Sequence, residues 1–306
     1  MYDNVLAAPD GVSDYVELWW GNPAEWHWGD GRPRLRVGIA VSEAESLVAK
    51  DRARAIENVG RAYLLICPSE FSARAYLESP IAVPVVVVPF GVNVSEMPYT
   101  SRKWGCQHRM NFLLAGAAQF RKGTWLGVEA FLKAFWRMGR VHLTVWSSTK
   151  TPMLAELQTE YHGLKQITFD ETHYDSPLEV FSKHHVLLSP HLSEGFGLLI
   201  PEAMSTGMPV IMSRVSSPME FFSDKFGSWI EMSEDYAPVS KCLENTGGFW
   251  RLPSVDSMAS AMSNANKFRG LSKDQGKRAS QYVKDNLTWG HTALGIVKAI
   301  EGRLNA

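Results

Sequence analysis

The chain has 306 residues, of which 45% are hydrophobic, so it can bury a substantial core and is expected to form two domains. Its 31 basic and 32 acidic residues give a net charge of −1, which excludes a general electrostatic attraction to nucleic acid or anionic lipid. Three widely separated cysteines, Cys67, Cys106 and Cys242, indicate neither a disulfide framework nor a zinc site, and they favour a cytoplasmic location.

The first block of the chain begins with clustered tryptophans and then alternates strands and helices. Trp19, Trp20, Trp26 and Trp28 crowd into one short stretch, which predicts either core packing or an acceptor site. The hydrophobic pattern next predicts strands at 35–41, 62–67 and 85–88, and helices at 43–59 and 71–78. The longest nearly apolar run, 81–90, is about half of the roughly 20 residues that span a bilayer. No transmembrane segment is therefore expected, and the first four residues do not predict a secretory signal.

A second block follows the polar stretch 93–108, which contains Pro98 and Gly105 and is the predicted linker. Beyond it, strands are expected at 111–115, 141–146, 167–169, 185–189 and 209–212. Helices are expected at 124–136, 153–161, 177–184 and 201–205, with terminal helical regions at 255–268 and 273–304. This alternation predicts the α/β class, with a parallel, doubly wound sheet in each block and ligands at the carboxyl ends of the strands.

The segment 193–211 carries the strongest chemical signal and predicts a loop, a helix and a strand in succession. Pro201 fits a first helical turn, Glu202 complements the positive end of the helix, and Gly207 fits a left-handed C-terminal cap.

Two glycines and two glutamates in this segment indicate a ligand. Gly195 and Gly197 flank Phe196 where the helix begins, which leaves backbone N–H groups open to an anion such as a pyrophosphate. Glu194 and Glu202 have seven residues between them and can reach different hydroxyl groups of one ligand, because carboxylates accept hydrogen bonds from sugar hydroxyls.

The segment resembles the E-x7-E signature of the retaining, nucleotide-sugar-dependent glycosyltransferases of the GT-B fold, the glycosyl transferases group 1 of family 4. The resemblance covers roughly residues 62–306 and includes four further motifs in the same order, Pro68-Ser69-Glu70, residues 88–93, residues 112–116 with Arg121-Lys122-Gly123, and residues 217–220. It implies two Rossmann-like doubly wound domains, of which the N-terminal one is shortened. Residues 1–94 would form the acceptor-side domain, 95–283 the donor domain, and 284–306 a helix that packs back on the N-terminal domain.

The same resemblance assigns roles to individual residues. Glu194 and the backbone amides of Gly195, Phe196, Gly197 and Leu198 would hold the donor sugar, and Glu202 would bind the ribose. Lys122, next to Gly123, would neutralise the diphosphate with Arg121 beside it, which makes Glu194 and Lys122 the expected catalytic residues. The donor would be a UDP- or GDP-sugar, and its own phosphate oxygen would act as the base toward the acceptor. No metal and no permanently bound cofactor are expected, since the chain has no Asp-x-Asp motif.

Two departures from the family pattern concern the phosphates and the acceptor. Family members carry an arginine after the glycine that ends the first donor-domain strand, whereas Gly116 is followed by Ala117 and Ala118. The N-terminal half is short and lacks a clear counterpart of the family's acceptor-side histidine. The candidate acceptor-side residues are His27, Trp26, Ser42 and Glu43.

Three alternatives remain open, and the acceptor could be a glycan, a lipid, a small molecule or a modified DNA base. The chain could be a non-catalytic or partner-dependent nucleotide-sugar-binding subunit, or a GT-B epimerase or phosphorylase. It could instead transfer sugar to a modified base in DNA, a hypothesis motivated by the reduced acceptor domain and by the basic residues near the start, Arg32, Arg34, Arg36, Lys50, Arg52 and Arg54. His184, His185 and His191 flank a buried strand, where structural histidines are commoner than metal ligands, and Glu220 is expected to cap a helix.

Overall fold

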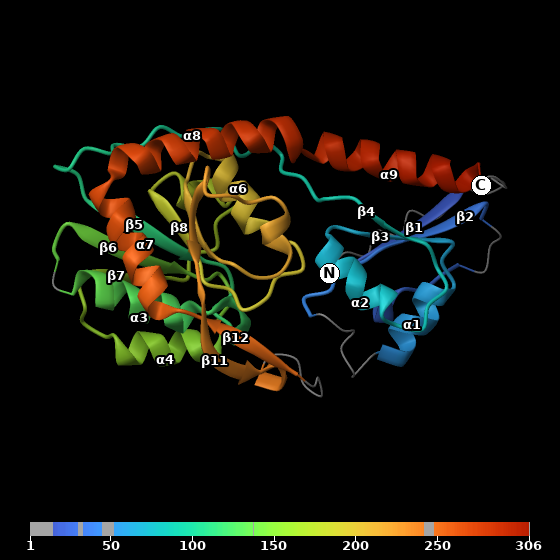
Figure 1. Ribbon diagram of the computed structural model, residues 1–306, viewed down its shortest axis with the longest axis horizontal. Coiled ribbons are helices and arrows are strands. Elements are labelled where there is room, and N and C mark those ends of the chain that lie inside the picture. The colour runs from blue at the N-terminus through green and yellow to red at the C-terminus, as the bar shows by residue number, and fades with distance from the viewer. Residues whose placement is uncertain (1–14, 30–32, 45–51, 137, 242–247, 306) are drawn as a thin grey trace. The chain divides into compact units, whose positions relative to one another are not determined.

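The computed structural model describes residues 15–29, 33–44, 52–136, 138–241 and 248–305 and divides into two compact units (Figure 1). Unit 1 comprises residues 1–89 and 293–306, and unit 2 comprises residues 90–292. Each unit contains a parallel sheet with helices, which confirms the predicted α/β class. Cys242, Arg32, Lys50 and residues 45–51 of the helix predicted at 43–59 lie outside the described residues.

Unit 1 is built on a four-stranded parallel sheet in the order β1-β2-β3-β4. Its strands are β1 (Val16–Trp20), β2 (Leu35–Ile39), β3 (Leu64–Cys67) and β4 (Val85–Val87). Its helical elements are η1 (Pro23–Glu25), α1 (Arg52–Gly60), α2 (Glu70–Leu77) and residues 293–304 of α9 (Trp289–Leu304). The sequence analysis predicted three of these strands and missed β1, which pairs with β2 along its whole length.

The tryptophan cluster of unit 1 supplies much of its core. Trp26 and Trp28 are buried, with 2% and 5% of their surface exposed, and their rings meet edge to face at 5.5 Å. Gly38 of β2 lies directly against the Trp26 ring, so a larger residue there would collide with it. The indole nitrogen of Trp28 donates a hydrogen bond to the carbonyl oxygen of Asn58 at 2.8 Å. Trp26 and Trp28 therefore pack unit 1.

Unit 2 is built on a six-stranded parallel sheet in the order β10-β9-β8-β5-β6-β7, to which a separate antiparallel hairpin of β11 and β12 is added. Its strands are β5 (Met110–Ala115), β6 (Val141–Trp146), β7 (Ile167–Asp170), β8 (Val186–Ser189), β9 (Val210–Ser213), β10 (Gly227–Ile230), β11 (Met232–Pro238) and β12 (Phe249–Pro253). Its helical elements are η2 (Phe120–Lys122), α3 (Thr124–Phe135), α4 (Pro152–Glu160), α5 (Leu178–Phe181), α6 (Leu199–Ser205), η3 (Ser217–Glu220), η4 (Val239–Lys241), α7 (Val255–Lys267) and α8 (Arg269–Asn286).

The helices of unit 2 cover both faces of its sheet (Figure 1). On one face α3 packs against α7 over a core that includes Phe112, Phe131 and Leu143. On the other face α6 packs against α8. Among the described residues, no helix is long and apolar enough to cross a membrane.

The predicted linker at 93–108 is held in unit 2 by a half-buried arginine. The guanidinium group of Arg102 donates hydrogen bonds to the carbonyl oxygens of Phe181, His184 and Thr206, at 3.2, 2.5 and 2.7 Å. Phe181 is the last residue of α5 and Thr206 follows α6, so Arg102 satisfies carbonyl groups that helices leave unpaired at their C-terminal ends. Burial lowers the pKa of Arg102 to about 10, which leaves it charged.

The terminal helical region predicted at 273–304 is interrupted at Leu287 and Thr288, between α8 and α9. There Val92 forms a parallel bridge with Thr288, and its N–H donates to the carbonyl oxygen of Leu287 at 2.9 Å. Gly91 permits this approach, because a side chain there would collide with the Thr288 backbone. The Thr288 hydroxyl then accepts the N–H of His291 at 3.3 Å and caps the start of α9.

Candidate active site

The candidate site lies at the carboxyl ends of β5 and β8, which are neighbours at the centre of the unit 2 sheet. From β5 the chain proceeds outward to β6 and β7, and from β8 it proceeds the other way to β9 and β10. This reversal makes the β5–β8 crevice the topological switch point, where ligands bind in open α/β sheets. A cavity opens there, lined by residues that include Gly116, Lys122, Glu194 and Gly197.

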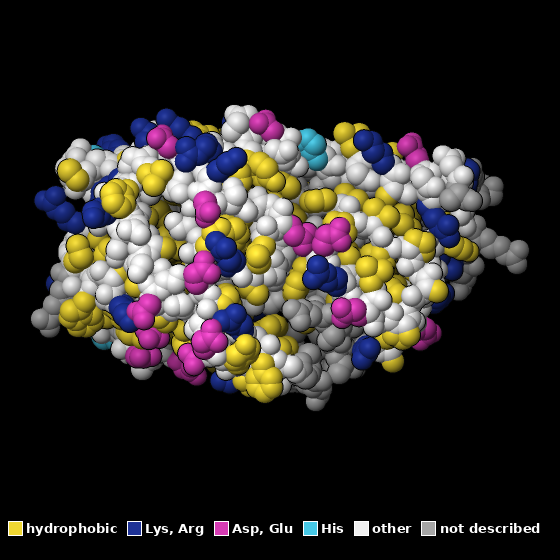
Figure 2. Space-filling model, viewed as in Figure 1, with side chains coloured by type: hydrophobic (Ala, Val, Ile, Leu, Met, Phe, Trp, Pro, Cys, Tyr) yellow, Lys and Arg dark blue, Asp and Glu magenta, His cyan; other side chains and the backbone are white. Residues whose placement is uncertain are grey.

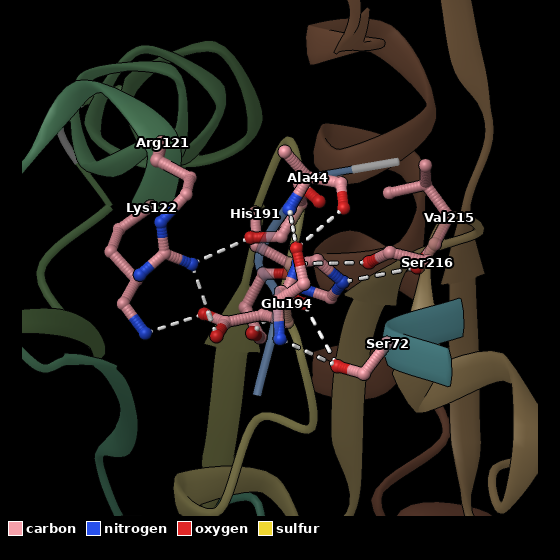
Figure 3. Close-up of polar contacts among 11 residues, drawn as sticks. Ala44, Ser72, Arg121, Lys122, His191, Glu194, Val215 and Ser216 are labelled. Atoms are coloured by element: carbon pink, nitrogen blue, oxygen red, sulfur yellow. Dashed lines mark hydrogen bonds and ion pairs between the residues drawn. The ribbon is translucent and has the colours of Figure 1, made fainter. Parts of the chain in front are cut away.

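The cavity contains a buried carboxylate held by two cations (Figure 3). Lys122 Nζ lies 2.5 Å from Glu194 Oε1, and Arg121 Nη1 lies 3.1 Å from Glu194 Oε2. Arg121 Nη1 also donates to the carbonyl oxygen of Ser193 at 2.6 Å. The side chains of Arg121 and Glu194 are each only 7% exposed, whereas that of Lys122 is 23% exposed. Of the two cations, Lys122 is therefore the one that a ligand can reach.

The charges of this cluster favour an anionic ligand. Burial raises the pKa of Glu194, but the charges of Lys122 and Arg121 outweigh it and lower the pKa to about 2. Burial lowers the pKa of neighbouring His191 to about 4, so that imidazole is neutral near pH 7. Two cations and one carboxylate then leave one net positive charge at the cavity, which suits a phosphate.

The segment 121–123 is fixed by its backbone as well as by the ion pairs. Arg121 and Lys122 belong to the short helix η2, which ends at Gly123 with φ 64°. Gly123 is also the residue before α3, and a side chain on it would collide with the carbonyl oxygen of Pro190. Only glycine fits this left-handed position so close to the end of β8. Gly123 thus places Lys122 beside the cavity.

Residues 194–198 precede α6, and we call them the donor loop after the role that the sequence analysis expects for them. The helix begins at Leu199, two residues earlier than predicted. Gly197 has φ 80°, and Leu198 is the residue before the helix. Phe196 between the glycines is 4% exposed, and its ring lies 5.4 Å from that of Phe90 and 5.2 Å from that of Phe221. The buried aromatic ring anchors the loop between its two glycines. Gly207 after α6 has φ 80°, as expected for the left-handed cap.

Glu202 lies in the first turn of α6 and differs electrostatically from Glu194. It is half-buried, and burial raises the pKa of its carboxyl group from 4.5 to about 7. The Glu202 carboxyl group therefore titrates near neutral pH. A ligand hydroxyl that hydrogen-bonds to the carboxylate would favour the ionised form.

The four acceptor-side candidates lie in unit 1, in different surroundings. Trp26 is buried under β2, and Ser42 is 6% exposed and follows the end of that strand. The Ser42 hydroxyl donates to the carbonyl oxygen of Ala44 at 2.8 Å. Glu43 is half-buried, whereas His27 is exposed and its Nε2 lies 3.4 Å from the guanidinium group of Arg54.

The histidines around β8 are satisfied by the protein itself. His184 Nδ1 lies 2.7 Å from the carbonyl oxygen of Val180, and its Nε2 lies 2.8 Å from the Thr144 hydroxyl. His191 Nδ1 lies 3.0 Å from the carbonyl oxygen of Ser189. Across the described residues, no group of three or more His, Cys, Asp or Glu side chains is arranged to hold a metal ion.

One site residue that the sequence analysis did not single out is Ser216. Its hydroxyl oxygen accepts a hydrogen bond from the backbone N–H of Glu194 at 2.9 Å (Figure 3). Ser216-Ser217-Pro218 is a turn sequence, which was the available signal, but the turn lies 22 residues from Glu194 in the chain. Only the folded sheet brings β9 and its following loop beside β8.

Residues 109–238 match the family described as glycosyl transferases group 1. No curated protein sequence matches the chain. Sucrose-phosphate synthase from Thermosynechococcus elongatus is similar in structure, with a TM-score of 0.65 and 18% identity over 88% of this chain and 67% of that one.

Two further solved structures were determined with bound nucleotides. Anabaena HepE, in complex with UDP and glucose, has a TM-score of 0.69 and 14% identity over 88% of this chain and 72% of that one. The pneumococcal O-GlcNAc transferase GtfA, in complex with UDP and GlcNAc, has a TM-score of 0.66 and 15% identity over 89% of this chain and 53% of that one. The chain thus spans about half of GtfA, and likeness at such identities shows a shared fold. With the family match in unit 2 and the GT-B fold of these neighbours, the chain is similar to the glycosyl transferases of group 1.

Proposed function

We propose that the chain is a glycosyltransferase that moves a sugar from a nucleotide diphosphate sugar to an acceptor hydroxyl with retention of configuration. The observation that carries the proposal is the Arg121–Lys122–Glu194 cluster at the switch point of a parallel sheet, beside the glycine-containing donor loop. The cluster has one net positive charge, the loop carries two glycines beside it, and the family match covers both.

In this proposal Lys122 serves the leaving group. Its ammonium group sits at the cavity and stabilises the negative charge that develops on the diphosphate as the glycosidic bond breaks. The acceptor oxygen attacks the anomeric carbon on the face that the diphosphate leaves. The acceptor proton passes to a departing phosphate oxygen, so no protein base is needed for this step.

Glu194 then acts by binding rather than by forming a bond. Its carboxylate is ionised and engaged by Lys122 and Arg121, which leaves it poorly suited to attack a sugar carbon. It orients the donor sugar together with the amides of the donor loop. Glu202, one turn into α6, accepts hydrogen bonds from the ribose hydroxyls.

UDP-sugars are the first donors to test, because HepE and GtfA were both solved with UDP. A GDP-sugar remains the next choice. The proposed location is the cytoplasm, and the acceptor class is left to experiment. On the face shown in Figure 2, basic side chains gather at the upper left over α8, and elsewhere basic and acidic side chains are interspersed. A modified DNA base therefore stays among the acceptors to test, and salt-sensitive duplex binding would support it.

The test is a thermal-shift and nucleotide-release screen of the purified chain against UDP-glucose, UDP-GlcNAc, GDP-mannose and UDP. A ligand that binds only the folded state raises its melting temperature. We expect one nucleotide sugar to stabilise the chain and to be slowly hydrolysed, and Glu202→Ala to weaken that stabilisation. Glu234→Ala is the matched control, since Glu234 lies on the exposed β11 strand. No shift with any donor would overturn the proposal.

A partner-dependent nucleotide-sugar-binding subunit is the second candidate, and one observation favours it. Val16, Leu18 and Trp20 on the edge strand β1 are 36%, 45% and 48% exposed and alternate along the strand, so they share one face. An apolar face of this kind is typical of an interaction surface. Donor binding without hydrolysis or transfer by the isolated chain would support this candidate over the first.

A further inference from the structure

Ser216 has a backbone conformation that a serine rarely adopts. Its φ is 58° and its ψ is −160°, and it is the non-glycine residue with positive φ among those the structure describes. This region of backbone space is nearly restricted to glycine, because a Cβ atom is crowded there. The sequence keeps a side chain at a position where glycine would be relaxed, which indicates that the side chain has a role there.

The hydroxyl of Ser216 binds the first residue of the donor loop. Its oxygen accepts the N–H of Glu194 at 2.9 Å, and the N–H of Ser217 donates to the Glu194 carbonyl oxygen at 3.4 Å. Glu194 is therefore held at both backbone polar groups by consecutive serines and at its carboxylate by Arg121 and Lys122. A glycine at 216 would keep the turn but would leave the Glu194 N–H without this acceptor.

The same turn also supports the far end of the donor loop. A Cβ atom on Gly197 would lie 3.2 Å from Pro218 Cγ, so the loop backbone passes close to that proline ring. Phe221, just beyond, contacts Phe196. The segment 216–221 thus backs the loop at Glu194, Phe196 and Gly197. In Figure 3, Ser216 lies on the side of Glu194 opposite Arg121 and Lys122.

We propose that Ser216 is a positioning residue for the sugar-transfer reaction, kept in a strained conformation because its hydroxyl sets the orientation of Glu194 and of the donor-loop amides. This inference rests on the proposed function for its effect on turnover. Its structural part, the fixing of the Glu194 N–H by the Ser216 hydroxyl, can be measured without any donor.

Three substitutions separate the strain from the hydrogen bond. Ser216→Gly removes both, Ser216→Ala removes only the hydrogen bond, and Ser216→Thr keeps the hydroxyl while adding bulk. We expect the Gly variant to melt at or above the wild-type temperature and the Ala and Thr variants to melt below it. We expect kcat with the donor to fall about tenfold in both the Gly and Ala variants, since each loses one hydrogen bond, and to stay nearer wild type in the Thr variant. Ser233→Ala is the control, because the Ser233 hydroxyl accepts the N–H of Asp235 at 3.1 Å in the exposed hairpin.

Hydrogen exchange at the Glu194 amide provides the readout that needs no donor. Exchange should accelerate in the Gly and Ala variants and not in the Thr variant. Wild-type protection of that amide in Ser216→Gly, or wild-type turnover in the same variant, would overturn the inference. Turnover that merely follows melting temperature across the three variants would also overturn it. If the wild-type chain hydrolyses no nucleotide sugar, the proposed function fails, and the exchange measurement still decides whether Ser216 holds Glu194.

Discussion

The donor loop and the first turn of α6 each present one glutamate, and the two side chains lie in opposite electrostatic settings. Glu194 is almost fully buried between Lys122 and Arg121, and these charges lower its pKa to about 2. Glu202 is half-buried, and burial raises its pKa to about 7. The two carboxylates of one E-x7-E motif therefore cannot serve the same purpose.

This difference indicates that the two glutamates of the motif have different roles. The charge of Glu194 is already compensated by Lys122 and Arg121, so that residue is part of a preorganised frame. Burial disfavours the charge of Glu202, so its carboxylate becomes favourable when ligand hydroxyls donate to it. Substitutions of Glu194 should thus lower both stability and activity, whereas substitutions of Glu202 should raise stability and weaken donor binding.

The largest effect is expected for Glu194→Ala. Removing the carboxylate leaves the buried Arg121 guanidinium without its charge partner, and loss of one member of a buried pair costs about 3–5 kcal/mol. The free energy of unfolding from urea titration and the rate of donor turnover should both fall steeply. Glu234→Ala is the control, because its ion pair with Arg251 is exposed and such pairs contribute about 0–1 kcal/mol. A Glu194→Ala variant as stable as Glu234→Ala would show that the frame interpretation is wrong.

Lys122→Met should affect activity more than stability, which sharpens the contrast with Glu194. Arg121 remains to compensate Glu194, so the free energy of unfolding should change by about 1–2 kcal/mol. Turnover should fall about 100- to 1,000-fold, the loss typical of removing one group that stabilises transition-state charge. Single-turnover kinetics with the donor measure this. Lys133→Met is the control, since Lys133 pairs with Asp256 on an exposed surface. Equal losses of turnover in both variants would contradict the assignment of Lys122.

Glu202→Gln tests the electrostatic setting of Glu202 through the pH dependence of stability and of donor binding. Between pH 4.5 and about 7 the folded protein retains a proton that the unfolded chain has lost, so this group makes the free energy of unfolding fall as pH rises. Glutamine does not titrate, and the variant should exceed wild type in stability at pH 8 by about 1–3 kcal/mol. Its donor affinity should be lower than that of wild type above pH 7, where the wild-type carboxylate is ionised.

Urea titrations at pH 4.5, 6 and 8, with and without donor, give both quantities for Glu202→Gln. Parallel stability profiles for wild type and variant would refute the raised pKa. A variant that binds donor as well as wild type at pH 8 would instead refute the ribose contact.

The sequence predicts a strand or helix well where the hydrophobic pattern of that segment alone determines it. The strands of unit 2 such as 110–115 and 141–146 are short apolar runs bounded by turn residues, and they lie within one residue of where the pattern placed them. The β11–β12 hairpin was missed because residues 232–236 lack apolar alternation, and β1 was missed because it was considered only as part of an aromatic cluster.

The site was predictable in its residue types and not in its electrostatics. The spacing of Glu194 and Glu202 indicated two ligand-facing carboxylates, yet nothing in the sequence shows that Arg121 is buried against the first. That contact joins residues 73 positions apart and depends on β5 and β8 being neighbours. The positive φ of Ser216 is likewise set by the packing of β9 and its following loop against the donor loop.

The smallest effect is expected where the chain departs from the family pattern, at Ala117. Arg121 and Lys122 both form ion pairs with Glu194, so an added cation beside Gly116 would be one that Glu194 does not already hold. Ala117→Arg should lower the KM for the donor about two- to fivefold, with a benefit that shrinks as salt rises, since partly exposed charges are screened. Gln119→Arg adds the same charge at an exposed position two residues on and should leave KM unchanged. Equal effects from both substitutions would mean that net charge near the crevice matters and the placement after β5 does not, whereas no effect from Ala117→Arg would mean that Lys122 already supplies all the phosphate charge compensation that the site can use.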